Sequence, residues 1–355
     1  MPGVLQGRRG LVMGVANERS LAWSIAQAAH REGAELAFTF GLPQLEKRVR
    51  PLAERVGASL VLPCDVQSDQ DIASVFAQVG RRWEKLDFLI HAIAFANREE
   101  LKGLYADTSR EGFHLALDVS AYSLVAVTRA ALPLMGEGGS IVTLSYLGAE
   151  RTLPHYNVMG VAKAALEASV RYLAADVGPR GIRVNALSAG PVRTLASAGV
   201  GGFRNVLDWY AANAPLRRAT NQDEVGDASL LLLSDWGRGI TGEVIYVDSG
   251  YHIVGVPSAV GGERMTVHLV DVEIAEKLLG AGFEGLVLES LTGAFEEYGS
   301  FTDEIRIASH RLPKAAAELL DAGWRVLANG KPFRPATAFA ASVRSRQNWF
   351  EVEGS

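Results

Sequence analysis

The chain has 355 residues, of which 48% are hydrophobic, so it can bury a large core in one large domain or two. A net charge of −5, from 35 basic and 40 acidic residues, argues against a general nucleic-acid surface, which normally leaves a domain strongly basic. The single cysteine, Cys64, rules out an internal disulfide, and no apolar run approaches the roughly 20 residues of a membrane helix. We therefore expect a cytoplasmic protein without membrane insertion.

The first two thirds of the chain alternate short apolar runs with helical patterns. The predicted strands are "RGLVMGV", "ELAFTF", "SLVLPCDV", "LDFLIHAIAF", "GSIVTLSYLG", "IRVNALSAG" and "EVIYVDSG". Helices are expected between them, including "LAWSIAQAAHREG", "SDQDIASVFAQVGRRW", Tyr122–Met135 and a helix from Asn157. Seven strands connected through helices predict an α/β protein with a Rossmann-like, doubly wound parallel sheet.

The pattern changes near residue 260, after "VGVPSAVGGER", which predicts one domain over 1–260 and a second over 261–355. In the second, "EKLLGAGFEGLVL" and "ELLDAGWRVLANG" align at an offset of 41, and each is typical of a helix closed by glycine and followed by a strand. Together with "MTVHLVDV" and "TDEIRIAS", they predict a small α+β domain of ferredoxin-like β-α-β-β-α-β order.

Several residues suggest a dinucleotide site in the first domain. Gly14 follows the first strand, where a residue without Cβ lets the backbone approach a phosphate, and the hydroxyl and N–H of Ser20 could both bind a pyrophosphate oxygen. "AFTFGLPQ" has no acidic residue for the adenosine ribose and no basic residue directly after it for a 2′-phosphate, so NADH is favoured over NADPH unless Arg19 binds that phosphate. Asp65 could accept from the adenine amino group or, equally, act as a helix N-cap.

Tyr156 and Lys163 are seven residues apart in a helical pattern, so they would share a face with Cα atoms about 10.5 Å apart. At that distance the lysine would hold something between the two side chains, such as ribose hydroxyls, and its charge would favour a hydrogen-bonded or partly ionised phenol. The tyrosine would then act as the acid. The alternative is a surface lysine and an unrelated packed tyrosine.

These elements together resemble the enoyl-[acyl-carrier-protein] reductases, a divergent branch of the short-chain dehydrogenase/reductase family. The resemblance covers about residues 5 to 256 and rests on "GVANERSLAWSIA", "CDV", "HAIAFA", "SYLGAER", "YNVMGVAKAALEASVRYLA" and "RVNALSAGPVRTLA". Ordinary members of the larger family have the lysine four residues after the tyrosine and an active-site serine upstream. Here position 160 is Gly and Tyr146 stands near the serine's place, a departure specific to enoyl reductases.

The resemblance implies NADH-dependent reduction of trans-2-enoyl thioesters in fatty-acid synthesis, with an acyl carrier protein as partner, a homotetramer and no metal. Tyr156 would hydrogen-bond the thioester carbonyl, and Tyr146 would line the pocket near the enone. The implied catalytic residues are Tyr146, Tyr156 and Lys163, and the implied substrate residues are Ala96, Tyr146, Tyr156 and Phe203. The NADH site would comprise Gly14, Ser20, Leu21, Asp65, Val66, Ile93, Lys163, Val192, Arg193, Thr194, Leu195 and Ala196.

Two further segments bear on partners. "LASAGVGGFRNVLDWY" is expected to form a mobile lid over an apolar acyl chain, or else an ordinary surface helix and loop, and Arg204 is its one basic residue. "NGKPFRPATAFAASVRSRQNWF" has four basic residues and no acidic one. It either attracts the acidic carrier protein, or forms an arm that packs against a neighbouring subunit or is simply solvated.

The sequence departs from the family pattern in three places, and two other functions are alternatives to the one that the resemblance implies. Ala94 and Ser24 stand where relatives often have glycine and could alter cofactor affinity, and the reduced basic content of the lid puts carrier docking in doubt. Carbonyl–alcohol oxidoreduction on the same fold is opposed by Gly160 and the seven-residue spacing. Non-catalytic NADH sensing through the second domain is opposed by the intact Tyr156 and Lys163.

Overall fold

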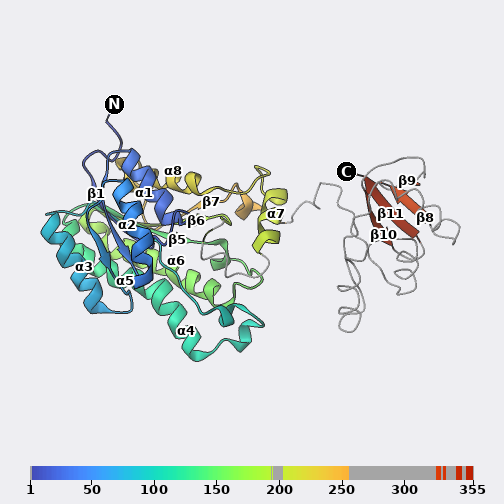
Figure 1. Cartoon of the computed structure of the whole chain (residues 1–355), viewed down its shortest axis with the longest axis horizontal. Coiled ribbons are helices and arrows are strands. Elements are labelled where there is room, and N and C mark those ends of the chain that lie inside the picture. The colour runs from blue at the N-terminus through green and yellow to red at the C-terminus, as the bar shows by residue number, and fades with distance from the viewer. Residues whose placement is uncertain are drawn as a thin grey trace. The chain divides into compact units, whose positions relative to one another are not determined.

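The structure is a computed structural model that describes residues 2–192, 194 and 203–255, without the side chains of 203–205, and the backbone of four short strands between 325 and 354. The chain separates into two compact units, Met1–Gly255 and Val256–Ser355. Each is described by itself below (Figure 1).

The first unit is built on a seven-stranded sheet in which every neighbouring pair of strands is parallel. The strand order is β3-β2-β1-β4-β5-β6-β7, which confirms the predicted doubly wound sheet. The strands are β1 (Arg9–Met13), β2 (Glu35–Phe40), β3 (Val61–Pro63), β4 (Phe88–His91), β5 (Gly139–Ser145), β6 (Ile182–Ala189) and β7 (Val244–Val247). Because helices cover both faces, the central strands β1 and β4 are buried along almost their whole length, with no alternation of buried and exposed positions.

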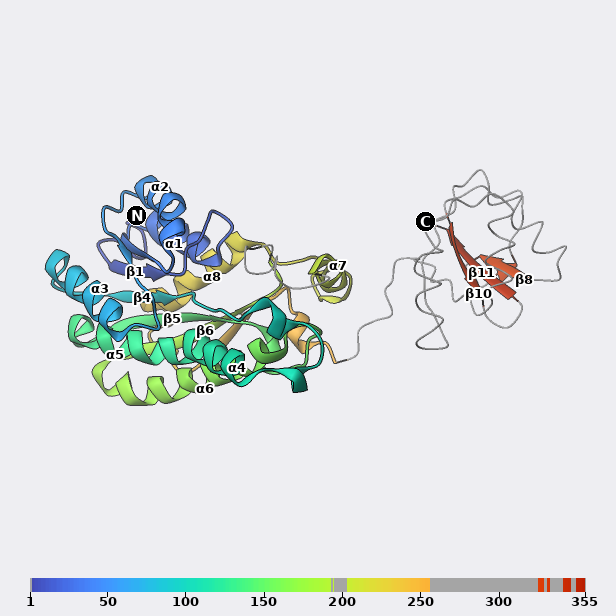
Figure 2. The same cartoon turned by 60° about the horizontal axis from the view of Figure 1, so that its bottom comes forward.

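Helices pack on both faces of this sheet. They are α1 (Leu21–Arg31), α2 (Glu46–Arg55), α3 (Asp69–Arg82), α4 (Arg110–Leu117), α5 (Ser123–Met135), α6 (Asn157–Val177), α7 (Phe203–Asn213) and α8 (Gln222–Leu233). Figure 2 shows α1, α2 and α8 on one face and α3, α5 and α6 on the other, which matches the two buried apolar clusters of the unit. α7 lies beyond one end of the sheet in both views, apart from these two layers.

The helix predicted over Tyr122–Met135 begins earlier than expected. It runs from Arg110 to Met135 through α4, a π-helical turn at Asp118–Tyr122, and α5. Ser109 caps its start, because the Ser109 hydroxyl accepts a hydrogen bond from Gly112 N at 2.9 Å. By length and composition this 26-residue helix could cross a membrane, but 56% of its apolar window is buried inside the unit, as in the core helix of an α/β domain.

The second unit contains a four-stranded sheet with the order β10-β11-β8-β9. Its strands are β8 (Arg325–Ala328), β9 (Lys331–Pro332), β10 (Ala341–Ser345) and β11 (Trp349–Gly354). β8 falls within the predicted strand "WRVLANG", and β10 pairs with β11 in antiparallel fashion. The other elements of the predicted ferredoxin-like order, and the basic side chains of the terminal segment, lie outside the described residues.

Candidate active site

The sheet changes its direction of winding between β1 and β4, which is where doubly wound folds bind ligands. Gly14 follows β1 at this point with a φ of +102°. A Cβ on Gly14 would lie 2.1 Å from the carbonyl oxygen of Ala92, which follows β4. Only glycine fits, so the two loops meet backbone to backbone at the predicted pyrophosphate position. Ile93, the next residue after Ala92, is partly buried.

Ser20 organises the turn between β1 and α1. It is 8% exposed, and its Oγ accepts hydrogen bonds from the N–H groups of Ala16 at 3.0 Å and Asn17 at 3.1 Å. Because both of these are donors, the hydroxyl proton of Ser20 points elsewhere and can meet an anion. α1 begins at Leu21 with no acidic residue in its first turn, so the positive end of the helix dipole is not neutralised there.

Ser24 belongs to the contact between α1 and α8. It is 3% exposed, and its hydroxyl donates to Leu21 O at 2.9 Å. A Cβ on Gly226 would lie 2.6 Å from Ser24 O, so glycine in α8 gives the room that the two helices need. A serine at position 24 is therefore accommodated without an unsatisfied hydroxyl.

Asp65 lies after β3 and is exposed. Its Oδ1 accepts from Gln67 N at 3.0 Å, while the N-cap of α3 is Ser68, whose hydroxyl accepts from Asp71 N. The expectation that Asp65 might itself be the N-cap is therefore wrong, because the chain turns for two more residues before the helix starts. The carboxylate still has an oxygen free of these turn bonds, and Val66 beside it is buried.

Tyr156 stands at the N-cap of α6 rather than inside the helix. His155 and Asn157 on either side have left-handed φ values of +59° and +38°, a conformation that costs energy for residues other than glycine. The side-chain amide of Asn157 donates to Glu100 O at 3.3 Å, which ties this turn to the loop after β4. A Cβ on Gly148 would lie 2.3 Å from Tyr156 Cδ1, so the tyrosine ring rests directly on the Gly148 backbone.

Tyr146 and Tyr156 form an aromatic pair at the carboxyl end of β5. Their ring centroids are 5.2 Å apart and their planes are inclined by 75°, an edge-to-face arrangement. Burial raises the pKa of both phenols, and the neighbouring Tyr146 and Glu167 raise that of Tyr156 further. Of the two expected states of the Tyr156 phenol, hydrogen-bonded or partly ionised, burial favours the protonated one, which is a hydrogen-bond donor at neutral pH.

Lys163, on α6, is 6% exposed. Its Nζ donates to Leu144 O, in β5, at 2.6 Å, which leaves two of its three donors. Burial lowers its pKa to about 8, partly offset by the negative charge of Glu167 one turn along the helix. Glu167 is also 6% exposed and accepts a short hydrogen bond from the hydroxyl of Ser145. α6 and the end of β5 are thus joined by buried polar contacts.

A buried histidine lies in the strand next to β5. His91 is fully buried at the end of β4, with Nδ1 2.9 Å from Thr143 Oγ1 and Nε2 2.9 Å from Ser123 Oγ. Burial and the nearby charge of Lys163 lower its pKa to about 3, so it is neutral at physiological pH. Lys163 is therefore the cation of this buried cluster.

The segment after β4 forms the side of the site where substrate residues were expected. Ala96 packs against the small cluster of Ala116, Val158 and Ala162. Ser120, in the π-helical turn, accepts from Phe95 N at 2.9 Å and donates to Phe95 O at 3.1 Å, so that turn fixes the backbone of the segment. Ala94 is exposed.

Part of the predicted site cannot be placed. Val192 and Thr194, which follow β6, are partly buried. Arg193, Leu195, Ala196 and the side chains of Phe203 and Arg204 lie outside the described residues.

Sequence reasoning missed several buried polar residues here. Glu167 could have been identified from the sequence, because it is four residues after Lys163 and so shares its helix face. Ser145 directly precedes Tyr146. His91 and Ser120 have no local signal, because their partners are 52 and 25 residues away in the sequence.

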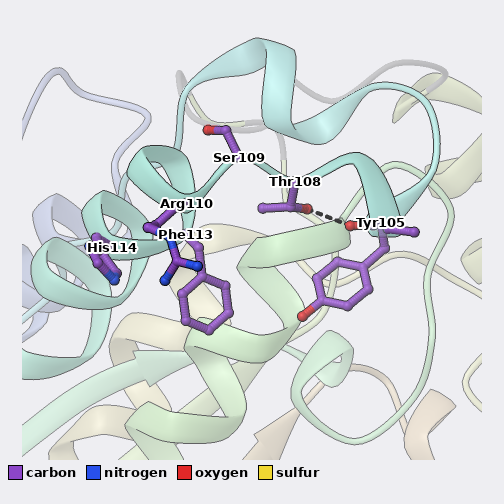
Figure 3. A pocket seen from close by; sticks show the side chains of 7 residues that line it. Tyr105, Thr108, Ser109, Arg110, Phe113 and His114 are labelled. Carbon is purple, nitrogen blue, oxygen red and sulfur yellow. Dashed lines mark hydrogen bonds between the residues drawn. The ribbon is translucent and has the colours of Figure 1, made fainter.

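A separate hollow of about 440 Å³ lies at the start of α4 (Figure 3). Its lining is Tyr105, Ala106, Thr108, Ser109, Arg110, Phe113 and His114. None of the predicted site residues lines it. Within the described residues there is no group of three or more His, Cys, Asp or Glu side chains that could hold a metal ion.

Comparisons with known proteins match the first unit. The family described as "Enoyl-(Acyl carrier protein) reductase" matches residues 14–252, which end before the second unit begins. The chain is 56% identical over 254 residues to "Enoyl-[acyl-carrier-protein] reductase [NADH] 1" of Rhizobium meliloti (strain 1021), covering 72% of this chain and 93% of that protein.

Two solved structures of enoyl reductases are also similar to the chain. The chain is 55% identical to the Bacillus cereus enoyl-acyl carrier protein reductase crystallised with NADP+ and indole naphthyridinone, with a TM-score of 0.71 over 72% of this chain and 100% of that one. It is 50% identical to the Anaplasma phagocytophilum reductase in complex with NAD, with a TM-score of 0.69 over 73% of this chain and 97% of that one.

Proposed function

The chain belongs to the enoyl-[acyl-carrier-protein] reductase family, and we propose that it reduces trans-2-enoyl thioesters to saturated acyl thioesters with NADH in fatty-acid synthesis. The observation that carries this proposal is the edge-to-face Tyr146–Tyr156 pair at the carboxyl end of β5, where the buried Lys163 donates to Leu144 O, two residues before Tyr146. The site offers a fixed hydroxyl donor and a buried cation beside the switch point of the fold.

The residues at the switch point fit a dinucleotide. Gly14 leaves a place that a Cβ would fill, and the proton of Ser20 is available to a phosphate oxygen. Asp65 has a free carboxylate oxygen for an adenine amino group. The proposed NADH residues are Gly14, Ser20, Leu21, Asp65, Val66, Ile93, Lys163, Val192 and Thr194, with Arg193, Leu195 and Ala196 from the undescribed stretch.

The proposed reaction requires Tyr156 to act as a hydrogen-bond donor. NADH, when bound, supplies the hydride that adds to the β-carbon of the enoyl thioester. Electron density then moves to the thioester carbonyl oxygen, and Tyr156 stabilises that oxygen with its phenol proton. Its raised pKa keeps this proton in place at neutral pH. A proton at the α-carbon completes the saturated product.

Lys163 has a positioning role in this proposal. One of its donors is held by Leu144 O, and the two others are available to ribose hydroxyls. Glu167 and Ser145 fix the helix and strand on either side of it. Tyr146 packs edge to face with Tyr156 and so restricts its ring, beside the enone that the two would contact.

The alternative of carbonyl–alcohol chemistry is disfavoured by the backbone at position 160. A Cβ on Gly160 would lie 2.8 Å from Gly148 O, so no lysine can stand four residues after Tyr156 without moving that loop. The lysine at position 163 reaches the site from one turn further along α6. Non-catalytic NADH sensing offers no reason for a protonated tyrosine pair beside the cofactor.

The partners and location form part of the same proposal. We assign the acyl carrier protein as carrier of the substrate, homotetrameric assembly, and a cytoplasmic location without membrane insertion. Size-exclusion chromatography with light scattering checks the assembly, and a mass near four times 38.0 kDa is expected.

The experiment that tests the function is an NADH absorbance assay with two thioesters. A short trans-2-enoyl thioester is expected to consume NADH, and the corresponding 3-ketoacyl thioester is expected to consume none. Consumption with the 3-ketoacyl thioester alone would favour the carbonyl chemistry, and consumption with neither would favour the binding protein.

A further inference from the structure

A third tyrosine lies close to the Tyr146–Tyr156 pair. Tyr210, on α7, is 3% exposed, and its hydroxyl makes no hydrogen bond with any residue that the structure describes. A buried hydroxyl without a partner destabilises the folded protein. This one therefore needs an explanation beyond packing.

The position of the Tyr210 ring is fixed from one side by Tyr251. The two rings stack with centroids 3.8 Å apart and planes inclined by 23°. Tyr251 is fixed in turn, because its hydroxyl accepts a hydrogen bond from Trp209 Nε1 at 2.8 Å. The ring of Tyr210 has little freedom, but its hydroxyl proton can still rotate.

The hydroxyl of Tyr210 interacts with that of Tyr146. The Tyr210 hydroxyl comes near enough to favour the ionised form of Tyr146, which lowers the Tyr146 pKa against the larger effect of burial. The Tyr146 oxygen in turn raises the pKa of Tyr210, after burial itself. Both pKa shifts correspond to a contact in which the Tyr210 hydroxyl is the donor and the Tyr146 oxygen is the acceptor. The two hydroxyls lie just outside strict hydrogen-bond geometry in the structure.

We infer that Tyr210 is a positioning residue of the active site that donates its hydroxyl proton to Tyr146. Because the Tyr146 oxygen is then an acceptor, its own proton is turned away from Tyr210 and into the site. Tyr210 thus selects one rotamer of the Tyr146 hydroxyl. This inference rests on the proposed function, because it assumes that Tyr146 faces the enoyl thioester.

The test is Tyr210→Phe, which removes one oxygen and keeps the stacked ring. It is compared with Tyr172→Phe, which removes a hydroxyl from a side chain that is 76% exposed, and both changes are repeated in a Tyr146→Phe background. We expect Tyr210→Phe to lower kcat about three- to tenfold with an unchanged KM for NADH. The same change should have no effect once Tyr146 lacks its hydroxyl. The melting temperature should stay the same or rise.

A second readout does not depend on activity. In protein labelled with 3-fluorotyrosine, the 19F resonance of Tyr146, assigned by its loss in Tyr146→Phe, reports the ionisation of that phenol. Tyr210→Phe should move this titration to higher pH, and Tyr172→Phe should leave it in place. An unmoved titration, or an equal loss of kcat in both backgrounds, overturns the inference. If the titration moves while the wild-type enzyme reduces no enoyl thioester, the hydrogen bond from Tyr210 to Tyr146 stands and the proposed function fails.

Discussion

Replacing Gly148 by alanine should displace the catalytic phenol without touching it chemically. The new Cβ would lie 2.3 Å from Tyr156 Cδ1 and 2.5 Å from Cε1, so the ring must withdraw by about 1 Å to reach the 3.4 Å of ordinary contact. Misplacing a catalytic group by that distance costs on the order of 100-fold in rate. We therefore expect kcat with a trans-2-enoyl thioester to fall about 100-fold, while NADH binding, followed by fluorescence, changes little.

A matched control separates this effect from the general cost of replacing a glycine. Gly178 ends α6 with a φ of −54°, and a Cβ there meets nothing within 4 Å. Gly178→Ala should keep full activity and a similar melting temperature. If Gly148→Ala retains activity within threefold of wild type while its fold is intact, the position of the Tyr156 ring is not what the reaction requires.

Three other expectations follow from the same site. Tyr156→Phe should lower kcat about 10²- to 10³-fold and change KM little, because the lost donor acts mainly as charge develops on the oxygen; equal activity would remove Tyr156 from the mechanism. Lys163 has a pKa of about 8, below its ordinary 10.5, so its ammonium is present below pH 8 and is lost above it. NADH affinity should therefore fall as the pH rises from 7 to 9, and Lys163→Met should bind NADH weakly with no such dependence, checked by fluorescence titration. Because folding disfavours the charged form of Lys163, the free energy of unfolding of the wild type should rise between pH 8 and 10.5. Lys163→Met should raise the free energy of unfolding by up to about 3 kcal/mol at pH 7, measured by urea denaturation. NADH should exceed NADPH at least tenfold in kcat/KM, because no basic residue directly follows β2; the opposite preference would identify the exposed Arg19 as the phosphate ligand.

The sheet was predictable because a parallel strand covered on both faces must be apolar along its length. β1, β4 and β6 are mainly apolar and buried at nearly every position, and all seven strands fall within the predicted segments. Cys64, in the predicted strand "SLVLPCDV", is 3% exposed, with a pKa raised by burial to about 12. These properties depend on the local pattern of side chains, which the sequence displays directly.

The details of the active site were less predictable, because they depend on backbone turns. The seven-residue spacing suggested that Tyr156 and Lys163 share one helix, but Tyr156 lies at the N-cap, between two residues of left-handed φ. In the sequence only Asn157 indicates this turn, since asparagine tolerates a left-handed φ better than most residues. The choice between a hydrogen-bonded and a partly ionised Tyr156 also depended on the fold, because burial, Tyr146 and Glu167 all raise its pKa.

The contacts of Tyr210 lay beyond sequence reasoning altogether. Tyr146, Tyr210 and Tyr251 come from the ends of different elements, and only the order of β5, β6 and β7 in the sheet brings those ends together. The lid prediction identified α7 as a segment of interest, but no periodicity in "FRNVLDWYAAN" distinguishes a tyrosine facing the site from one packed in a core.

The most direct test of the account is where the hydride goes. NADH with deuterium at the transferred position is incubated with a trans-2-enoyl thioester, and the product is analysed by mass spectrometry and NMR. The account predicts a saturated acyl thioester with one deuterium on the β-carbon and a solvent proton on the α-carbon. Deuterium on a carbonyl carbon, giving an alcohol, or an unchanged enoyl thioester with no NADH consumed, would contradict it.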